Sequence, residues 1–195
     1  MREIKNIFVV LEPRQEDQPA LSRAVYIAEA TGASVHIFMC AYDSAIGIAS
    51  FLSGGEKQTF VQTVLDGSQV MIDRLAEPIS AKSIAVTTEV VWDRHPSDAI
   101  LAASKNGSYD LLMKFARHQS RANVMFNHLD WNLMRYSPCP VMLVKTGQWD
   151  DVGQVLAAVH AAPDEIHEIL NRAILDRASY LAKQLDFELH LVSAF

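Results

Sequence analysis

The sequence predicts a doubly wound α/β domain, in which helices cover both faces of a five-stranded parallel sheet, followed by an incomplete second copy of the same pattern. Short apolar runs alternate with longer amphipathic stretches along the chain, as in β-α-β units. The apolar runs are continuous, which is typical of strands buried on both faces. Half of the 195 residues are hydrophobic and 21% are charged, so the chain can build a packed core.

Five apolar runs are predicted as the strands of the sheet. The first, IFVVL, ends before Pro13, and the third is rich in β-branched residues. The last follows the rigid segment Pro138-Cys139-Pro140. The five runs cover residues 7–11, 35–41, 84–92, 111–115 and 141–144.

Four helices are predicted between these runs. Asp17 is placed as the N-cap of the first helix, with Pro19 in its first turn and Gly32 at its C-cap. A looser stretch over residues 42–55 precedes the second helix, and the third runs from Pro96 to about Lys105. The second and fourth helices each carry an apolar stripe at helical spacing, which favours a core role. The stripes are Phe60, Val64, Val70 or Met71 and Leu75 in the second helix, and Met125, Leu129, Leu133 and Tyr136 in the fourth.

The pattern restarts after the first domain, which is assigned to residues 1–146. Residues 147–153 read as a linker, and residues 154–195 as the β-α-β start of a second domain, with strands at 155–159 and 189–194 around a helix at about 164–185. Tyr26-Ile27-Ala28 corresponds to Tyr180-Leu181-Ala182, and Val35-His36-Ile37 to Leu189-His190-Leu191. A lone unit with two strands is marginally stable. We therefore expect this piece to be a truncated copy or to pack on something else.

Composition and charge exclude several classes of protein. The 17 basic and 23 acidic side chains give a net charge of −6, which argues against a nucleic-acid-binding surface. No apolar run approaches the ~18 residues that a bilayer-spanning helix needs. Two cysteines suit a reducing cytosol, and the amino terminus has no signal-peptide pattern. These observations predict a cytoplasmic protein without a membrane span.

Three segments carry a family signature. They are His95-Pro96-Ser97-Asp98-Ala99-Ile100, Tyr109-Asp110-Leu111-Leu112-Met113, and Ser137-Pro138-Cys139-Pro140 with the strand that follows. Together and in this order they resemble the universal stress protein family over residues 1 to about 145. The tandem pattern, Asp17-Gln18-Pro19-Ala20-Leu21, Trp92 and Asp130-Trp131 are similar to the tandem, E-type bacterial members. The resemblance implies a Rossmann-like fold with ligands at the carboxyl ends of the strands, where the strand order reverses.

The ATP-binding members of that family have a glycine pattern that this sequence lacks. Their fourth strand is followed by Gly-x-x-Gly, nine residues, and Gly-Ser or Gly-Thr, because glycines let the backbone approach phosphates. Here no glycine lies between Gly107 and Gly147, and Phe115 or Ala116 and His118 stand near the first two motif positions. Although Glu12 lies near the family's acidic residue, we expect no ATP in the usual mode and no other cofactor.

A basic cluster follows Met113 at the ligand-facing end of the sheet. Lys114, Arg117, His118 and Arg121, together with Glu12, form the candidate ligand crevice. The cluster is either an anion site, in which side chains replace the lost backbone donors, or a solvated turn. Trp92-Asp93-Arg94-His95 ends the third strand at the same edge, and either lines the crevice or caps the next helix, with capping favoured.

No catalytic or metal-binding motif is found. The sequence has no HExxH, CxxC or Gly-x-Ser-x-Gly, and His36 and His190 are interpreted as hydrogen-bonded core histidines. Cys139 is interpreted as a packed thiol.

Three functions are compatible with these observations. The first is a non-catalytic stress-response protein that binds a small anionic or amphiphilic molecule, because Met113, Phe115, Met125 and Phe126 flank the basic cluster. The second is an interaction module that self-associates, as a homodimer or by pairing of tandem domains, since the second copy has unpaired strand edges. The third, an ATP-binding member or nucleotide hydrolase, would need the phosphate loop that is missing.

Overall fold

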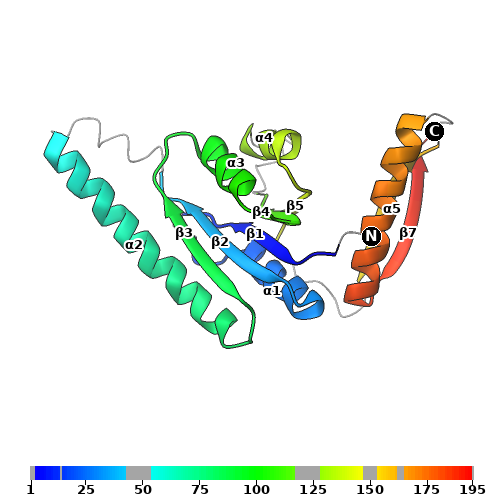
Figure 1. Ribbon diagram of the computed structural model, residues 1–195, viewed down its shortest axis with the longest axis horizontal. Helices are drawn as coiled ribbons and strands as arrows, with labels where there is room; N and C mark the ends of the chain where they lie inside the picture. Colours follow the sequence, from blue (N-terminus) through cyan, green and yellow to red (C-terminus); the bar gives the residue numbers. More distant parts are fainter. Residues whose placement is uncertain are drawn as a thin grey trace. The chain divides into compact units, whose positions relative to one another are not determined.

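Five parallel strands form a sheet in the spatial order β3-β2-β1-β4-β5 (Figure 1). The structure, a computed structural model, describes residues 3–13, 15–42, 54–116, 128–146, 153–161 and 165–194. The sheet belongs to a compact unit, Ile4–Thr146, and a second unit contains Gly147–Phe195. The strands are β1 (Asn6–Val10), β2 (Ser34–Cys40), β3 (Val86–Val91), β4 (Leu111–Phe115) and β5 (Val141–Val144). The predicted five-stranded parallel sheet is confirmed.

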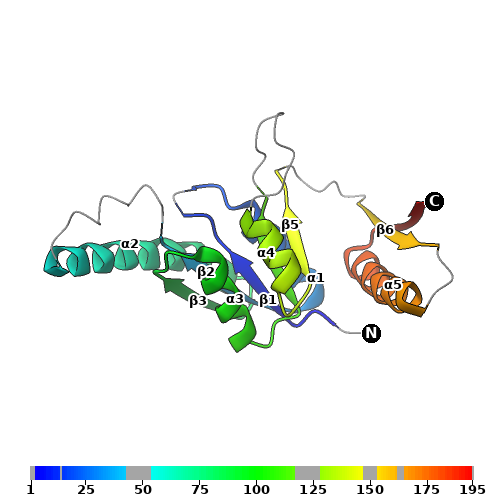
Figure 2. The same ribbon diagram turned by 90° about the horizontal axis from the view of Figure 1, so that it is seen from above.

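Two helices cover each face of this sheet, which makes the unit doubly wound (Figure 2). Helices α1 (Pro19–Thr31) and α2 (Gly54–Ser80) lie on one face, and α3 (Pro96–Asn106) and α4 (His128–Tyr136) lie on the other. The strand order reverses between β1 and β4, because β2 and β3 follow β1 on one side while β5 follows β4 on the other. In such sheets the carboxyl ends of the two strands at the reversal border a crevice.

The core beneath α3 and α4 is built on Phe8 of β1, which is fully buried. The Phe8 ring lies 5.3 Å from the ring of Phe38 and 4.8 Å from that of Tyr109. The hydrophobic cluster around Phe8 contains residues of three adjacent strands, β2, β1 and β4, and one residue each from α3 and α4. Its members are Phe8, Val10, Phe38, Cys40, Ile100, Leu112 and Leu133. Continuous apolar strands therefore fold as expected, since both faces of the sheet are covered.

Two details of the helices differ from the sequence prediction. The N-cap of α1 is Gln18 rather than Asp17, and no side chain caps this helix. In α2 the buried face runs through Ile72, Ala76 and Ile79, whereas Val70 is 53% exposed. Gly32 does cap α1 in the left-handed conformation, with a φ of 72°. Residues 43–53 of the looser stretch predicted at 42–55, and stripe residue Met125, lie outside the described residues.

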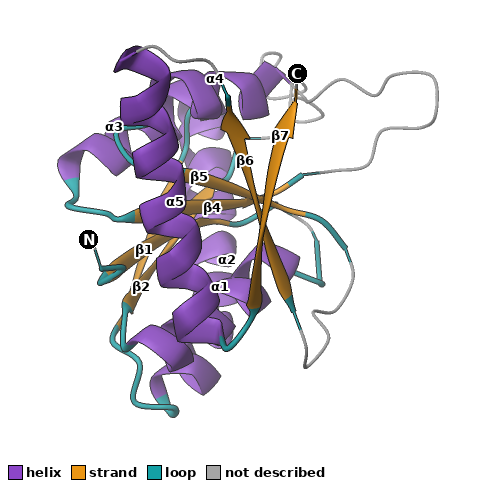
Figure 3. Ribbon diagram, turned by 90° about the vertical axis from the view of Figure 1, so that its right-hand side faces the viewer, coloured by secondary structure: helices purple, strands orange, loops and turns teal. Residues whose placement is uncertain are grey.

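The second unit contains one β-α-β element, shown with its strands and helix in Figure 3. Strands β6 (Gln154–His160) and β7 (Glu188–Ala194) pair in parallel, and α5 (Glu165–Leu185) connects them. Ala157 is buried, but several larger apolar side chains are exposed: Leu156, Ile166, Ile169, Leu170, Leu191 and Val192. A two-stranded sheet with one helix thus leaves much of its apolar surface in contact with water.

None of the described helices combines the length and the apolar character that crossing a bilayer requires.

Candidate functional site

The reversal of strand order brings Glu12 and Lys114 together, as the sequence predicts for the crevice. Glu12 follows β1, and Lys114 is the fourth residue of β4, where it pairs with Val10. Side chains alternate between the two faces of a strand, so Lys114 shares a face with Leu112, which packs beneath α4. The Lys114 side chain therefore enters the protein toward α4, although the sequence prediction assigned it to a basic cluster at the ligand-facing end of the sheet.

The Lys114 ammonium is enclosed by protein oxygens. Its Nζ atom lies 2.9 Å from Oε1 of Glu12 and 3.1 Å from Oδ1 of Asp130. It also donates a hydrogen bond of 2.8 Å to the carbonyl oxygen of Phe115. Lys114 is only 2% exposed, so these contacts replace the water that would otherwise solvate its charge. We call Glu12, Lys114 and Asp130 the ion cluster.

Asp130, in the first turn of α4, is a member that the site prediction missed. Its side chain is 3% exposed, and Oδ1 has an ion-pair distance to Lys114 but no hydrogen-bond partner in the described structure. The contact is therefore electrostatic rather than a well-directed hydrogen bond. The signal was in the sequence, because Asp130 stands three residues before the buried Leu133 and so shares its helix face.

Gln18 fixes the loop that carries Glu12. Its buried side-chain amide donates 2.8 Å hydrogen bonds to the carbonyl oxygens of Glu12 and Gln15. Its Oε1 accepts a hydrogen bond of 3.1 Å from the Glu12 backbone N–H. The side chain is thus occupied with the β1–α1 loop, which explains why it makes no capping bond to α1.

The predicted anion site is only partly described. Lys114 lies at the predicted position, but its charge faces two carboxylates and a carbonyl and is not presented to solvent. Arg117, His118 and Arg121 lie outside the described residues, as do Met125 and Phe126. Met113 and Phe115, the apolar residues predicted to flank the cluster, are both buried. The described residues of the predicted crevice are therefore buried in the core or paired within the ion cluster.

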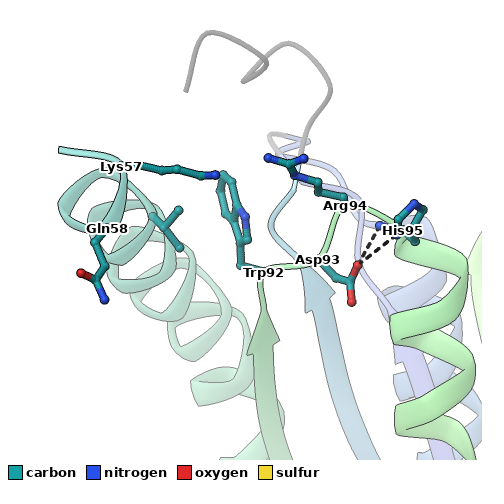
Figure 4. Close-up of a pocket in the computed structure, with 7 residues that line it drawn as sticks. Lys57, Gln58, Trp92, Asp93, Arg94 and His95 are labelled. Atoms are coloured by element: carbon teal, nitrogen blue, oxygen red, sulfur yellow. Dashed lines mark hydrogen bonds and ion pairs between the residues drawn. The ribbon is translucent and has the colours of Figure 1, made fainter. Parts of the chain in front are cut away.

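A pocket of about 550 Å³ lies at the carboxyl end of β3 (Figure 4). One wall comes from the amino-terminal half of α2, and the other from the loop between β3 and α3. Its lining consists of Lys57, Gln58, Val61, Trp92, Asp93, Arg94 and His95. Residues 92–95 line this pocket and not the predicted crevice, because the pocket is at an edge strand rather than at the reversal of strand order.

The favoured capping role of residues 92–95 is not found. The N-cap of α3 is His95, and no side-chain capping bond is made there. Asp93 instead accepts a hydrogen bond of 2.8 Å from the His95 backbone N–H. The carboxylate thus organises the turn before the helix, and the Trp92 ring remains at the pocket wall.

The two histidines that align in the repeat have different surroundings. His36 is hydrogen-bonded, at 2.7 Å to Oγ1 of Thr87 and 3.2 Å to Oε2 of Glu89, and its ring stacks on Phe8. This confirms the prediction of a hydrogen-bonded histidine in the core sheet. The corresponding prediction for His190 is wrong, because its side chain is 48% exposed and bonds to Glu188.

Both cysteines are free thiols. Cys40 is buried, and burial raises the pKa of its thiol. Cys139 packs against the core cluster, as predicted for a packed thiol. Within the described ranges, no group of three or more His, Cys, Asp or Glu side chains is arranged to hold a metal ion.

Comparisons of the sequence with protein families and with individual proteins point to one family. A sequence model of the universal stress protein family matches residues 3–145. The chain is 35% identical to Universal stress protein E of Photorhabdus laumondii, in an alignment that covers 100% of this chain and 63% of that protein. The chain therefore spans less than two thirds of the length of this relative.

Solved structures agree with this comparison. A functionally unknown protein from Pseudomonas aeruginosa PAO1 has a TM-score of 0.79 and 26% identity, over 98% of this chain and 61% of that chain. A universal stress protein in complex with cAMP has a TM-score of 0.51 and 20% identity, over 75% of this chain and 100% of that chain. At the latter identity the likeness concerns the fold alone.

Proposed function

The chain belongs to the universal stress protein family, and we propose that it is a non-catalytic stress-response protein that binds a small anionic or amphiphilic molecule without binding ATP in the family's usual mode. Membership of the family supports a role in the stress response. The observation that carries the exclusion of ATP is the ion cluster at the reversal of strand order. There Lys114 contacts two carboxylates and a backbone carbonyl of its own chain.

Binding of a nucleotide at this point requires donors that approach the phosphates. In the glycine pattern the donors are backbone N–H groups, and here Phe115 and Ala116 stand near the first motif glycine, both of them buried. The Lys114 ammonium already has protein oxygens as partners, and two carboxylates beside it would repel a polyphosphate. This arrangement supports a ligand other than ATP. The complex of a structural relative with cAMP does not change the proposal, because that likeness extends only to the fold.

The non-catalytic part of the proposal rests on the sequence. It has no HExxH, CxxC or Gly-x-Ser-x-Gly pattern. A cytoplasmic location is likewise proposed, and the two free cysteines, which suit a reducing compartment, support it.

Two measurements on the full chain test this function. We expect native mass spectrometry of the purified protein to show a retained small molecule, and calorimetric titration with Mg²⁺-ATP to show no saturable binding up to millimolar concentration. Micromolar ATP binding that is lost in Glu12→Ala would overturn the proposal, since Glu12 stands near the acidic residue of the family's nucleotide site. A bare protein that binds no anion in further titrations would overturn its ligand-binding part.

Self-association is a second candidate function, favoured by the surface of the second unit. We propose that residues 154–195 are the opening β-α-β element of a second domain of the same fold. The parallel pairing of β6 and β7 and the greater length of the relatives support this assignment. The exposed apolar side chains of this element, among them Ile166 at 79% exposure, would be covered by an associating surface.

Light scattering over a range of protein concentrations tests this association. We expect a dimer or larger species that dissociates in Ile169→Glu, which places a charge on the exposed apolar surface. The matched control is Ser179→Glu, which adds the same charge at an exposed polar position of α5. A wild-type protein that stays monomeric at every concentration would exclude the association.

A further inference from the structure

We propose that the pocket between α2 and the β3–α3 loop is the ligand site, and that it takes a small aromatic molecule with one anionic group, such as a sulfonate, carboxylate or phosphate monoester. This inference rests on the proposed function and specifies where the ligand binds and what its chemistry is. It rests on three features of the pocket: its apolar wall, its cationic rim and its separation from the ion cluster.

The apolar wall is formed by Trp92 and Val61. The indole of Trp92 meets the rings of Tyr42 and Phe60 at nearly right angles, with ring centroids 5.5 Å and 6.4 Å away. These edge contacts hold the indole in place before a ligand arrives, which lowers the entropic cost of binding. The volume of about 550 Å³ lies within the range of ordinary small-molecule sites. A flat aromatic group can pack against this apolar wall.

The rim supplies positive charge from both walls. Lys57 extends from α2 toward the tip of the Trp92 indole, and Arg94 projects from the β3–α3 loop (Figure 4). In the described part of the chain neither side chain has an ion-pair partner. Among the described lining residues the one carboxylate is Asp93, which accepts a hydrogen bond from the His95 backbone N–H and lies 3.8 Å from Nδ1 of His95.

The position of the pocket also favours an anion. It lies where α3 begins, so the positive end of the helix dipole adds to the two cationic side chains. Because two cations face one occupied carboxylate, a single anionic group balances the local charge better than a polyanion does. An uncharged aromatic molecule would leave Lys57 and Arg94 without a partner.

The pocket is independent of the ion cluster. It stands at the end of β3, an edge strand, whereas the ion cluster joins β1, β4 and α4, and β2 lies between. A ligand in the pocket therefore leaves the Lys114 contacts intact. The two sites can be tested separately by variants in one of them.

The test is calorimetric titration of the full chain with naphthalene-1-sulfonate, with naphthalene-1-sulfonamide as its uncharged counterpart. We expect saturable binding of the sulfonate and much weaker binding of the sulfonamide. Lys57→Gln and Arg94→Gln should each weaken sulfonate binding about tenfold, because each removes a charged donor. Trp92→Leu should weaken both compounds. Lys105→Gln, which removes an exposed cation in the last turn of α3, is the matched control and should change nothing.

Three results would overturn the site: no sulfonate binding by the wild-type chain, equal affinity for the two compounds, or affinities unchanged in Lys57→Gln and Arg94→Gln. Circular dichroism of each variant excludes misfolding as the cause of lost binding. Failure of the pocket and failure of the proposed function are distinguishable. A retained small molecule in native mass spectra, with sulfonate binding absent, would refute the pocket alone, whereas micromolar ATP binding that depends on Glu12 would refute the proposed function.

Discussion

Replacement of Lys114 by methionine tests whether the ion cluster is a part of the folded core. The substitution keeps an unbranched apolar stem and removes the ammonium that faces Glu12 and Asp130. Asp130 would then carry a charge that is 97% shielded from water and has no remaining ion-pair partner among the described side chains, since its side chain is 3% exposed. Loss of one member of a buried pair costs about 3–5 kcal/mol of unfolding free energy.

Urea denaturation followed by tryptophan fluorescence measures this loss. With a denaturant slope of about 2 kcal/mol per M, a loss of 3–5 kcal/mol lowers the unfolding midpoint by about 1.5–2.5 M. The matched control is Lys105→Met at an exposed site, where the unfolding free energy should change by less than about 0.5 kcal/mol.

A second variant separates the buried charge from the change in shape. Lys114→Met combined with Asp130→Asn removes both charges of the most buried pair, and we expect it to regain about 1–3 kcal/mol relative to Lys114→Met alone. The reasoning fails if Lys114→Met is as stable as the wild type, or if the two substitutions destabilise additively. If Lys114→Met does not fold, recovery of a folded protein in the double variant gives the same information.

Three further predictions concern the β1–α1 loop, the core and the buried thiol of Cys40. Gln18→Ala should lower the unfolding free energy by about 1–3 kcal/mol, because it leaves the Glu12 N–H without its side-chain acceptor; Gln62→Ala, at an exposed position, is its control in thermal denaturation. Phe8→Ala should cost about 3–5 kcal/mol in urea denaturation, and a loss below about 1 kcal/mol would contradict the packing described for this core. Burial raises the pKa of the Cys40 thiol, so the protonated thiol favours the folded state. Its contribution to the unfolding free energy is present below the unfolded pKa of about 8.5 and is lost as the pH rises through the pKa of the folded state. Cys40→Ala should therefore flatten the alkaline decline of the unfolding free energy between pH 8 and 10, and an unchanged decline would contradict the assignment.

The strands could be predicted from the sequence because each is an apolar run bounded by turn residues. The burial of Lys114 could not be predicted in the same way, since a single lysine at the end of an apolar run is compatible with a turn as well as with a strand. The alternation of Leu112 and Lys114, combined with the three-residue spacing of Asp130 and Leu133, would have indicated that the two charges face each other.

The pocket illustrates a second limit of sequence interpretation. Residues 92–95 could be placed at the ligand-facing edge, because they end a predicted strand. Lys57 and Val61 could not be added, since their place depends on how far α2 extends past the sheet and how it is rotated. The wrong prediction for His190 has a similar cause: the alternation of a strand does not tell which of its faces another element covers.

The energetics of the two places at the carboxyl edge favour the pocket over the reversal of strand order as the ligand site. An anion that recruited Lys114 would have to separate it from Glu12 and Asp130, at a cost of about 3–5 kcal/mol. Such a cost weakens binding by a factor of about a hundred to several thousand. An anion that recruits Lys57 and Arg94 displaces only water, because neither cation has an ion-pair partner in the described structure. The same kind of charge thus stabilises the fold where it is buried and paired, and is available for binding where it lies at the pocket rim.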